Sequence, residues 1–256
     1  MSFAQKRSEP VISQLIHSPQ PAVVDSGLLN QDAIEFLIQL HQNFEHDRQR
    51  LLQDRNKAKG KLPQFNEDTA NIRQSAWKAA PIPEILQDRR IEITGPVDAK
   101  TVINALNSDA NVFMADFEDS TSPTWANMLC GQEVLFRAVR NELSWSPDKR
   151  APRQSVYRLN PKRKTVLMVR PRGLHLNEKN VQVDSQVLSG FLFDLGMFAF
   201  HNAKALSAQQ RGPFFYIPKL QSPAEAQWVN SVLEYIETEL ALPIGQMKVT
   251  VLIETL

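Results

Sequence analysis

The feature that most constrains the fold is a series of five short apolar runs, separated by helical stretches, that begins near residue 90. Several of these runs are almost continuously apolar rather than alternating. Such runs are typical of parallel strands covered on both faces. The predicted strands are 91–94, 111–117, 165–169, 214–218 and 248–253. Alternating strands and helices predict an α/β fold with a parallel sheet and right-handed crossovers.

Helical spacing of apolar residues lies between these strands and also precedes them. The predicted helices cover residues 30–59, 98–106, 124–142, 191–206 and 222–240. The last has the clearest start, because Ser222 is a good N-cap, Pro223 suits the first position and Glu225 can close a capping box. Residues 174–190, after the third strand, are expected to form a hairpin or an excursion.

The first predicted helix, 30–59, carries many charges of both signs. Interspersed charges favour a solvated helix face over a nucleic-acid patch. We expect His41 and His46, five residues apart in this helix, to lie on that surface rather than to bind a metal.

Length limits how much of a barrel the chain can form. A (β/α)8 barrel typically takes about 250 residues, whereas the strand–helix region begins only near residue 91. We therefore expect residues 91–256 to form an incomplete TIM barrel of about five strands, truncated part-way round. Residues 1–90 are expected to form an N-terminal helical arm.

Composition narrows the class of protein. The chain has 256 residues and a formal net charge of +1, so it lacks the basic surplus of a nucleic-acid binder. Its single cysteine, Cys130, excludes an internal disulfide and a multi-cysteine zinc site. It has neither an apolar stretch long enough to cross a bilayer nor the apolar core of a signal peptide. The expectation is a cytoplasmic protein without nucleic-acid or membrane partners.

Charged residues follow four of the five predicted strands at or near the carboxyl end. These are Asp116, Glu118 and Asp119 after the second strand, Arg170 and Arg172 after the third, Lys219 after the fourth and Glu254 after the fifth. Ligands of α/β sheets and barrels bind beyond the carboxyl ends of the strands. The pattern therefore predicts an active site at this edge of the sheet.

The types of residue at that edge limit the chemistry that the site can perform. Carboxylates are hard ligands suited to Mg²⁺, which can polarise a carbonyl group. Arginine can hold a carboxylate or stabilise a developing enolate. Together they indicate an enzyme acting on small keto- or aldehydo-acids, with carbon–carbon bond formation or cleavage through an enolate.

Long ordered segments of the chain resemble malate synthases of the shorter, A-type form. The segments are DRRIEITGP (88–96), GPVDAKTVINALNSDANVFMADFEDSTSPTWANMLCGQ (95–132), VRPRGLHLNEKNV (169–181), LFDLGMFAFHN (192–202), FFYIPKLQSPAEAQWV (214–229) and VLIETL (251–256). The resemblance implies a TIM barrel with an N-terminal helical clasp. It also implies condensation of acetyl-CoA with glyoxylate to (S)-malate and CoA in the glyoxylate cycle, with Mg²⁺ as cofactor.

The resemblance also assigns residue roles. Arg170 matches the arginine that stabilises the enolate, and Glu254 matches a glutamate that ligates Mg²⁺. Glu118 and Asp119 match carboxylates that line the site, whereas Arg172 and Lys219 are either weaker substrate contacts or structural residues. The family's second metal ligand and its catalytic base, both aspartates, lie beyond residue 256. We therefore expect this polypeptide not to complete the reaction alone.

The resemblance further implies a monomeric full-length enzyme, located in a peroxisome or glyoxysome if the source is eukaryotic. Two alternatives remain at this point. One is a Mg²⁺-dependent acyl-CoA lyase like the citrate-lyase β subunit. The other is a non-catalytic remnant, whose open sheet would expose unpaired edges and promote self-association.

Overall fold

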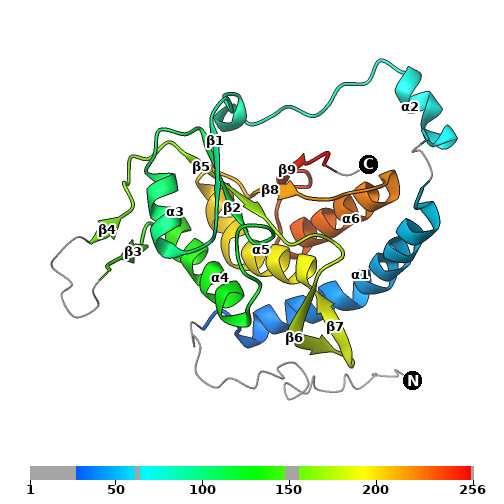
Figure 1. Cartoon of the computed structure of the whole chain (residues 1–256). Coiled ribbons are helices and arrows are strands. Elements are labelled where there is room, and N and C mark those ends of the chain that lie inside the picture. The colour runs from blue at the N-terminus through cyan, green and yellow to red at the C-terminus, as the bar shows by residue number, and fades with distance from the viewer. Residues whose placement is uncertain (1–26, 61–63, 148–155, 255–256) are drawn as a thin grey trace, which may run out of the picture.

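The centre of the molecule is a five-stranded parallel sheet with strand order β1-β2-β5-β8-β9 (Figure 1). The structure is a computed structural model that describes residues 27–60, 64–147 and 156–254. The strands are β1 (Glu92–Gly95), β2 (Val112–Asp116), β5 (Val166–Arg170), β8 (Phe214–Ile217) and β9 (Lys248–Val251). Each coincides with a predicted strand, so the α/β prediction is confirmed. The first 26 residues of the expected arm lie outside the described ranges.

All five predicted helices are present. They are α1 (Gln31–Ala58), α3 (Ala99–Leu106), α4 (Trp125–Val139), α5 (Gly190–Ala208) and α6 (Pro223–Glu239). Three short helices lie in the segment between α1 and β1. They are the 3-10 helix η2 (Glu67–Thr69), the α-helix α2 (Ala70–Gln74) and the 3-10 helix η3 (Glu84–Leu86). In Figure 1 this segment forms an arc that stands away from the sheet before the chain enters β1.

Two short antiparallel pairs lie outside the main sheet. Strands β3 (Ser144–Trp145) and β4 (Tyr157–Arg158) pair with each other. Strands β6 (Asn177–Val183) and β7 (Gln186–Ser189) form the hairpin predicted within 174–190.

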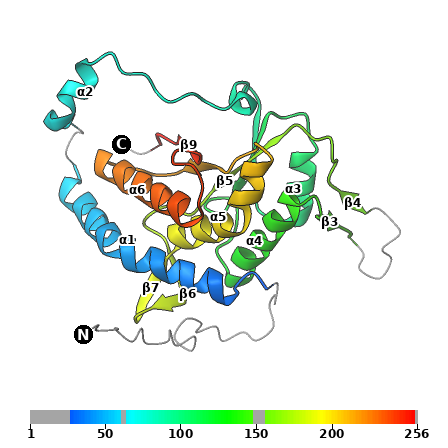
Figure 2. The same cartoon turned by 180° about the vertical axis from the view of Figure 1, so that it is seen from behind.

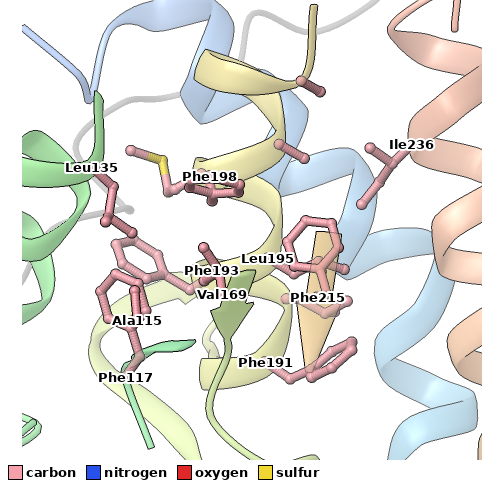
Figure 3. Packing of buried hydrophobic residues seen from close by; sticks show 14 of the residues in the cluster. Ala115, Phe117, Leu135, Val169, Phe191, Phe193, Leu195, Phe198, Phe215 and Ile236 are labelled. Atoms are coloured by element: carbon pink, nitrogen blue, oxygen red, sulfur yellow. The ribbon is translucent and has the colours of Figure 1, made fainter. Parts of the chain in front are cut away.

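The main core lies between the sheet and its helices. Side chains that alternate along the strands, including Ala115, Val169 and Phe215, face α5 and its neighbours (Figure 3). Helix α5 lies between the sheet and α1, which explains why its sequence is apolar on nearly every side: residues from Gly190 to Ala199 are all buried. A helix that is apolar all round is expected only where every face is covered.

The other face of the sheet has a smaller core of its own. Its members come from β2, β5, β8 and the η3 turn: Leu86, Val112, Met114, Val166, Met168, Phe214 and Tyr216. In a barrel, this face lines the interior, which is packed with side chains rather than open.

Contacts across this inner face show that the sheet is curled. In a flat sheet, β1 and β8 would lie about 14 Å apart, because neighbouring strands are separated by about 4.8 Å. Yet the Tyr216 hydroxyl on β8 contacts Glu92 on β1, and Arg89 Nη1 donates to Thr250 Oγ1 on β9 at 2.8 Å. Only strong curvature brings these side chains together. The predicted partial barrel is therefore confirmed.

Helix α1 clasps the sheet domain from behind, across α5 and α6 (Figure 2). Its contact with α5 is close at Gly196, where a Cβ atom would lie 2.7 Å from Leu40 Cδ1. The prediction of a solvated charged face is wrong for part of this helix. Glu45 and Arg48 form a buried ion pair at 2.7 Å, and Arg48 also donates to the Leu174 carbonyl oxygen.

His41 is also buried, contrary to the prediction, whereas His46 is exposed as expected. The reason is the same for His41, Glu45 and Arg48. They recur at three- and four-residue spacing on the face that meets the β6–β7 side of the sheet domain, and they lie beside apolar residues of the same face. Burial lowers the pKa of His41, although Glu45 and Asp184 partly oppose this.

The start of α6 is built as predicted, with one change. The Ser222 hydroxyl accepts from the Glu225 N–H. The Glu225 carboxylate reaches back to the Gln221 N–H at 2.7 Å, one residue before the expected capping-box partner. It also accepts from Arg55 of α1 at 2.6 Å, with only 1% of the Glu225 side chain exposed. The capping residue Glu225 therefore also links helix α1 to the sheet domain.

Strand β9 has a different environment from the central strands. It pairs with β8 on one side. Its side chains Val249 and Val251 are 41% and 45% exposed, and Ile253, which follows the strand, is 94% exposed. Unpaired edges and exposed apolar faces favour association with another chain segment.

Candidate active site

The site is organised by a buried ion pair at the carboxyl ends of two neighbouring strands. Asp116 is the last residue of β2, Arg170 is the last residue of β5, and the two are paired in register. Arg170 donates from Nε to Asp116 Oδ1 at 2.7 Å and from Nη2 to Oδ2 at 2.6 Å. This bidentate geometry fixes the plane of the guanidinium group.

The same carboxylate shapes the loop that follows β2. Asp116 accepts from the backbone N–H groups of Glu118, Asp119 and Ser120, and from the Ser120 hydroxyl. Short-range bonds of this type are how an aspartate stabilises a turn. Burial alone would raise the pKa of Asp116, but Arg170 and these donors outweigh it and lower that pKa. Asp116 is therefore ionised and holds both the loop and Arg170.

The loop brings two further carboxylates beside Arg170. Asp119 lies 3.1 Å from Arg170 Nη2 and is half exposed, whereas the Glu118 side chain is 1% exposed and 3.9 Å from Arg170 Nε. Burial raises the pKa of Glu118, although Lys219 opposes this. Within the described ranges, neither oxygen of Glu118 has an aligned hydrogen-bond partner. Such a group is a candidate ligand for a cation or a water molecule.

Lys219 connects the loop to the end of β9. Its ammonium group lies 2.9 Å from Asp119 and 3.1 Å from Glu118. Its backbone N–H donates to Glu254 Oε1 at 3.1 Å. Lys219 adopts a left-handed backbone conformation with φ 54°, which is uncommon for a residue other than glycine and often accompanies a functional constraint. Glu254 itself is exposed.

Arg172 points away from this group into the protein. It donates to Asp194 of α5 at 2.8 Å from both Nε and Nη2, and it pairs with Glu178 of β6 at 2.9 Å. Its side chain is 2% exposed. The sequence left two possibilities for Arg172, a substrate contact or a structural residue. These buried contacts are those of a structural residue.

The structure thus places Arg170, Glu118, Asp119, Lys219 and Glu254 at one edge of the sheet, linked by ion pairs and a hydrogen bond from one to the next. Sequence reasoning missed Asp116 as the partner of Arg170. A usable signal was present, since both residues end apolar runs of similar length in adjacent predicted strands.

Hard oxygen donors are available here for a divalent cation. Glu118 has a buried carboxylate without aligned partners, and Asp119 and Glu254 lie on either side of Lys219. Oxygen ligands of this kind suit Mg²⁺. Among the described residues, however, no three acidic, histidine or cysteine side chains are gathered closely enough to enclose a metal ion. The fit is that of part of a magnesium site.

The sheet is parallel and curled, and an arginine and several acidic side chains lie at its carboxyl edge. These features define the class of protein as a TIM-barrel-type α/β protein with a carboxylate-rich site. Family models describe two parts of the chain. The N-terminal domain of malate synthase matches residues 21–70, and the malate synthase TIM-barrel domain matches residues 166–256. The chain belongs to the malate synthase family.

Curated relatives agree with this assignment. The chain is 52% identical to the bifunctional glyoxylate cycle protein of Caenorhabditis elegans over 91% of its length and 24% of that protein. It is 50% identical to malate synthase of Myxococcus xanthus over 90% of its length and 42% of the relative. For malate synthase A of Escherichia coli, identity is 45% over 91% of this chain and 44% of the relative. The chain therefore spans less than half the length of these relatives.

None of the described helices combines the length and the apolar character needed to cross a bilayer.

Proposed function

We propose that this chain carries the arginine and part of the acidic ligand set of a malate synthase active site, which joins acetyl-CoA to glyoxylate. The supporting observation is the orientation of Arg170 by Asp116 at the carboxyl edge of a curled sheet. An oriented, half-paired guanidinium group is what a reaction through an enolate requires, because negative charge develops on a carbonyl oxygen.

Arg170 has donors left for a substrate. Asp116 occupies Nε and Nη2, and Asp119 also lies near Nη2. Within the described residues, no hydrogen bond involves Nη1. Its two N–H groups are therefore free to bind the enolate oxygen or the carboxylate of glyoxylate. The bidentate pairing holds the group in place before substrate arrives, which limits the reorganisation needed during the reaction.

Magnesium is proposed as the cofactor, held by Glu254 with Glu118 or Asp119. When bound, a Mg²⁺ ion supplies Lewis acidity that polarises the aldehyde of glyoxylate. The role of Lys219 in this proposal is to neutralise Glu118 and Asp119, which lie within 3.1 Å of its ammonium group. Burial would lower the pKa of Lys219, but both carboxylates raise it, so the side chain stays protonated.

Partners and location follow from the same proposal. The substrates are acetyl-CoA and glyoxylate, and the full-length enzyme is a monomer. Relatives from Cucumis sativus and Glycine max are named glyoxysomal malate synthases. If the source is a eukaryote of this kind, a glyoxysomal or peroxisomal location is proposed, and otherwise a cytoplasmic one.

Glyoxylate binding and turnover test the proposal separately. We expect calorimetry with glyoxylate and Mg²⁺ to detect binding to the unaltered chain, and Arg170→Gln to weaken it at least tenfold. An Arg158→Gln control, which removes an exposed arginine on β4, leaves binding unchanged. Absence of glyoxylate binding to the unaltered chain contradicts the proposal. Malate formation, followed as released CoA thiol, tests the expectation that this polypeptide does not complete the reaction alone.

The acyl-CoA lyase alternative is less well supported. Relatives named malate synthase match about nine-tenths of this chain at 40–50% identity. Product analysis with citryl or malyl thioesters in place of acetyl-CoA and glyoxylate distinguishes the two reactions, because a lyase cleaves these thioesters to acetyl-CoA and an oxo acid without releasing free CoA thiol.

A further inference from the structure

A cleft of about 590 Å³ lies at the end of the sheet opposite to the candidate active site. It is formed by loops that precede β1, β2, β5 and β8, so it borders the amino ends of the strands. Clefts of about 300–1,000 Å³ accommodate small-molecule ligands. Nothing in the proposed malate synthase reaction uses this end of the sheet.

Two half-buried arginines line this cleft. Arg163 precedes β5, and its Nη2 donates to the Ala138 carbonyl oxygen at 3.1 Å. Arg211 precedes β8, and its Nη2 donates to the Thr165 carbonyl oxygen at 2.8 Å. Arg163 Nη1 also donates to the Asn141 side-chain oxygen and, at 3.4 Å, to the Asn160 carbonyl oxygen. These bonds fix both guanidinium groups, and among the described residues they leave Nε of each arginine and Nη1 of Arg211 without a hydrogen-bond partner.

Neither arginine has an acidic partner. Among the described residues, no carboxylate lies within ion-pair distance of Arg163 or Arg211, although Arg48, Arg55, Arg170 and Arg172 all have one. Burial lowers the pKa of both Arg163 and Arg211, and the charge of Arg211 lowers that of Arg163 further. Two like charges that are partly desolvated and unpaired are unfavourable until an anion joins them.

We propose that this cleft binds the phosphate group of a small, nucleotide-sized molecule between Arg163 and Arg211. Guanidinium groups match phosphate oxygens in geometry and bind them by charge-assisted hydrogen bonds. Lys162 and Lys164 add exposed positive charge at the rim, which raises the local concentration of anions. Among the apolar residues of the lining, half-buried Ile85 offers a surface for the rest of the ligand.

The remaining charges of the lining limit what binds. Glu84, Asp88 and Asp109 also border the cleft, so four basic residues face three acidic ones. Asp88 is engaged by Arg90 at 2.8 Å. A single phosphate gains the two arginines without meeting a large negative field, whereas an extended polyanion is repelled by the acidic side. We therefore expect a monophosphate to bind more tightly than a triphosphate or a nucleic acid.

Calorimetric titration of the full chain with inorganic phosphate and with adenosine monophosphate tests this site. Both probes are expected to bind saturably, and Arg163→Gln and Arg211→Gln are each expected to weaken binding at least tenfold. Arg163→Lys and Arg211→Lys retain the charge and part of the affinity, and they serve if a glutamine variant fails to fold. Both probes are also expected to raise the melting temperature of the unaltered chain, because they bind only the folded state.

Two controls locate the binding. Arg170→Gln alters the opposite end of the sheet, and Arg158→Gln removes an exposed arginine of β4; neither is expected to change phosphate affinity. The inference is overturned if neither probe binds saturably, if Arg170→Gln is the variant that abolishes binding, or if all arginine variants weaken it equally. None of these results bears on glyoxylate binding, which is measured separately.

Discussion

Asp116 and Arg170 end neighbouring parallel strands and meet through two hydrogen bonds of 2.7 and 2.6 Å. Because the two residues are paired in register, the strand alignment itself sets the distance between their backbones. The carboxylate is fully buried and the arginine side chain is 8% exposed. The position of the proposed catalytic arginine therefore depends on sheet register as well as on its own loop.

Asp116→Asn removes the charge that holds Arg170. Breaking one side of a buried ion pair costs about 3–5 kcal/mol of stability, because the other charge remains buried without compensation. Chemical denaturation measures this loss. Asp119→Asn is the matched control, since Asp119 contacts the same arginine but is 53% exposed, and exposed pairs contribute at most about 1 kcal/mol. Equal effects of the two substitutions would contradict the assigned role of Asp116.

Arg55→Gln separates the clasp from the start of α6. It leaves Glu225, whose side chain is 1% exposed, without its cationic partner, so we expect a loss of several kcal/mol. Lys57→Gln is the control on the same helix, because the Lys57–Asp54 pair is exposed on both sides and contributes less than about 1 kcal/mol. Limited proteolysis at the end of α1 should accelerate only in Arg55→Gln. Unchanged proteolysis in that variant would count against a tie between the two parts.

Gly196→Ala tests the close contact between α1 and α5. In an open helix, replacing glycine with alanine stabilises by about 0.5–1 kcal/mol. Here the new methyl group would lie 2.7 Å from Leu40 Cδ1, and overpacking costs about 1–3 kcal/mol. A net loss of stability is expected in thermal unfolding. Adding Leu40→Ala should produce a double variant less destabilised than the sum of the single changes; simple additivity would exclude the clash.

Glu118→Gln tests the buried carboxyl group through pH. Burial raises the pKa of Glu118 in the folded state above its ordinary value of 4.5, so the folded protein binds more protons than the unfolded chain just above pH 4.5. Stability contributed by this group therefore falls as pH rises through the folded-state pKa. We expect Glu118→Gln to flatten that part of the stability curve, with exposed Glu239→Gln as control. Identical pH profiles for Glu118→Gln and the unaltered chain would refute the shift.

Val251→Lys tests the exposed face of β9. Val251 is 45% exposed and shares that face with Val249, which is 41% exposed, so self-association of the unaltered chain is expected. A lysine on an edge strand opposes such pairing. Size-exclusion chromatography should show a shift toward monomer in Val251→Lys. A clean monomer of the unaltered chain would argue against the non-catalytic remnant considered from sequence.

The sequence predicted the strands well because each is a short apolar run bounded by charged or turn-forming residues, as at Val112–Asp116. It predicted the helix starts where a side chain caps the backbone, as Ser222 does. These are local effects, so neighbouring residues suffice to reveal them. The site edge followed from the rule that carboxyl ends of parallel strands gather on one side.

Ion pairs between residues far apart in the chain could not be predicted from the sequence. The partner of Arg172 is Asp194, which lies 22 residues away in the otherwise apolar segment 191–200 of α5. Charges such as Arg48 resemble a solvated face until the packing of α1 against the β6–β7 hairpin is known. Periodicity indicates which residues share a face of a helix, but not what that face meets.

The contacts of Glu92 and Arg89 with Tyr216 and Thr250 bear on how this fold can change. Because they join strands that are not neighbours, they set the radius of the curved wall from within. A segment that packs against either end of the sheet must therefore fit a curvature that these contacts already determine. Substitutions of Glu92, Arg89, Tyr216 or Thr250 would therefore change the curvature of the sheet, and with it the spacing of the strand ends, without touching a reacting group.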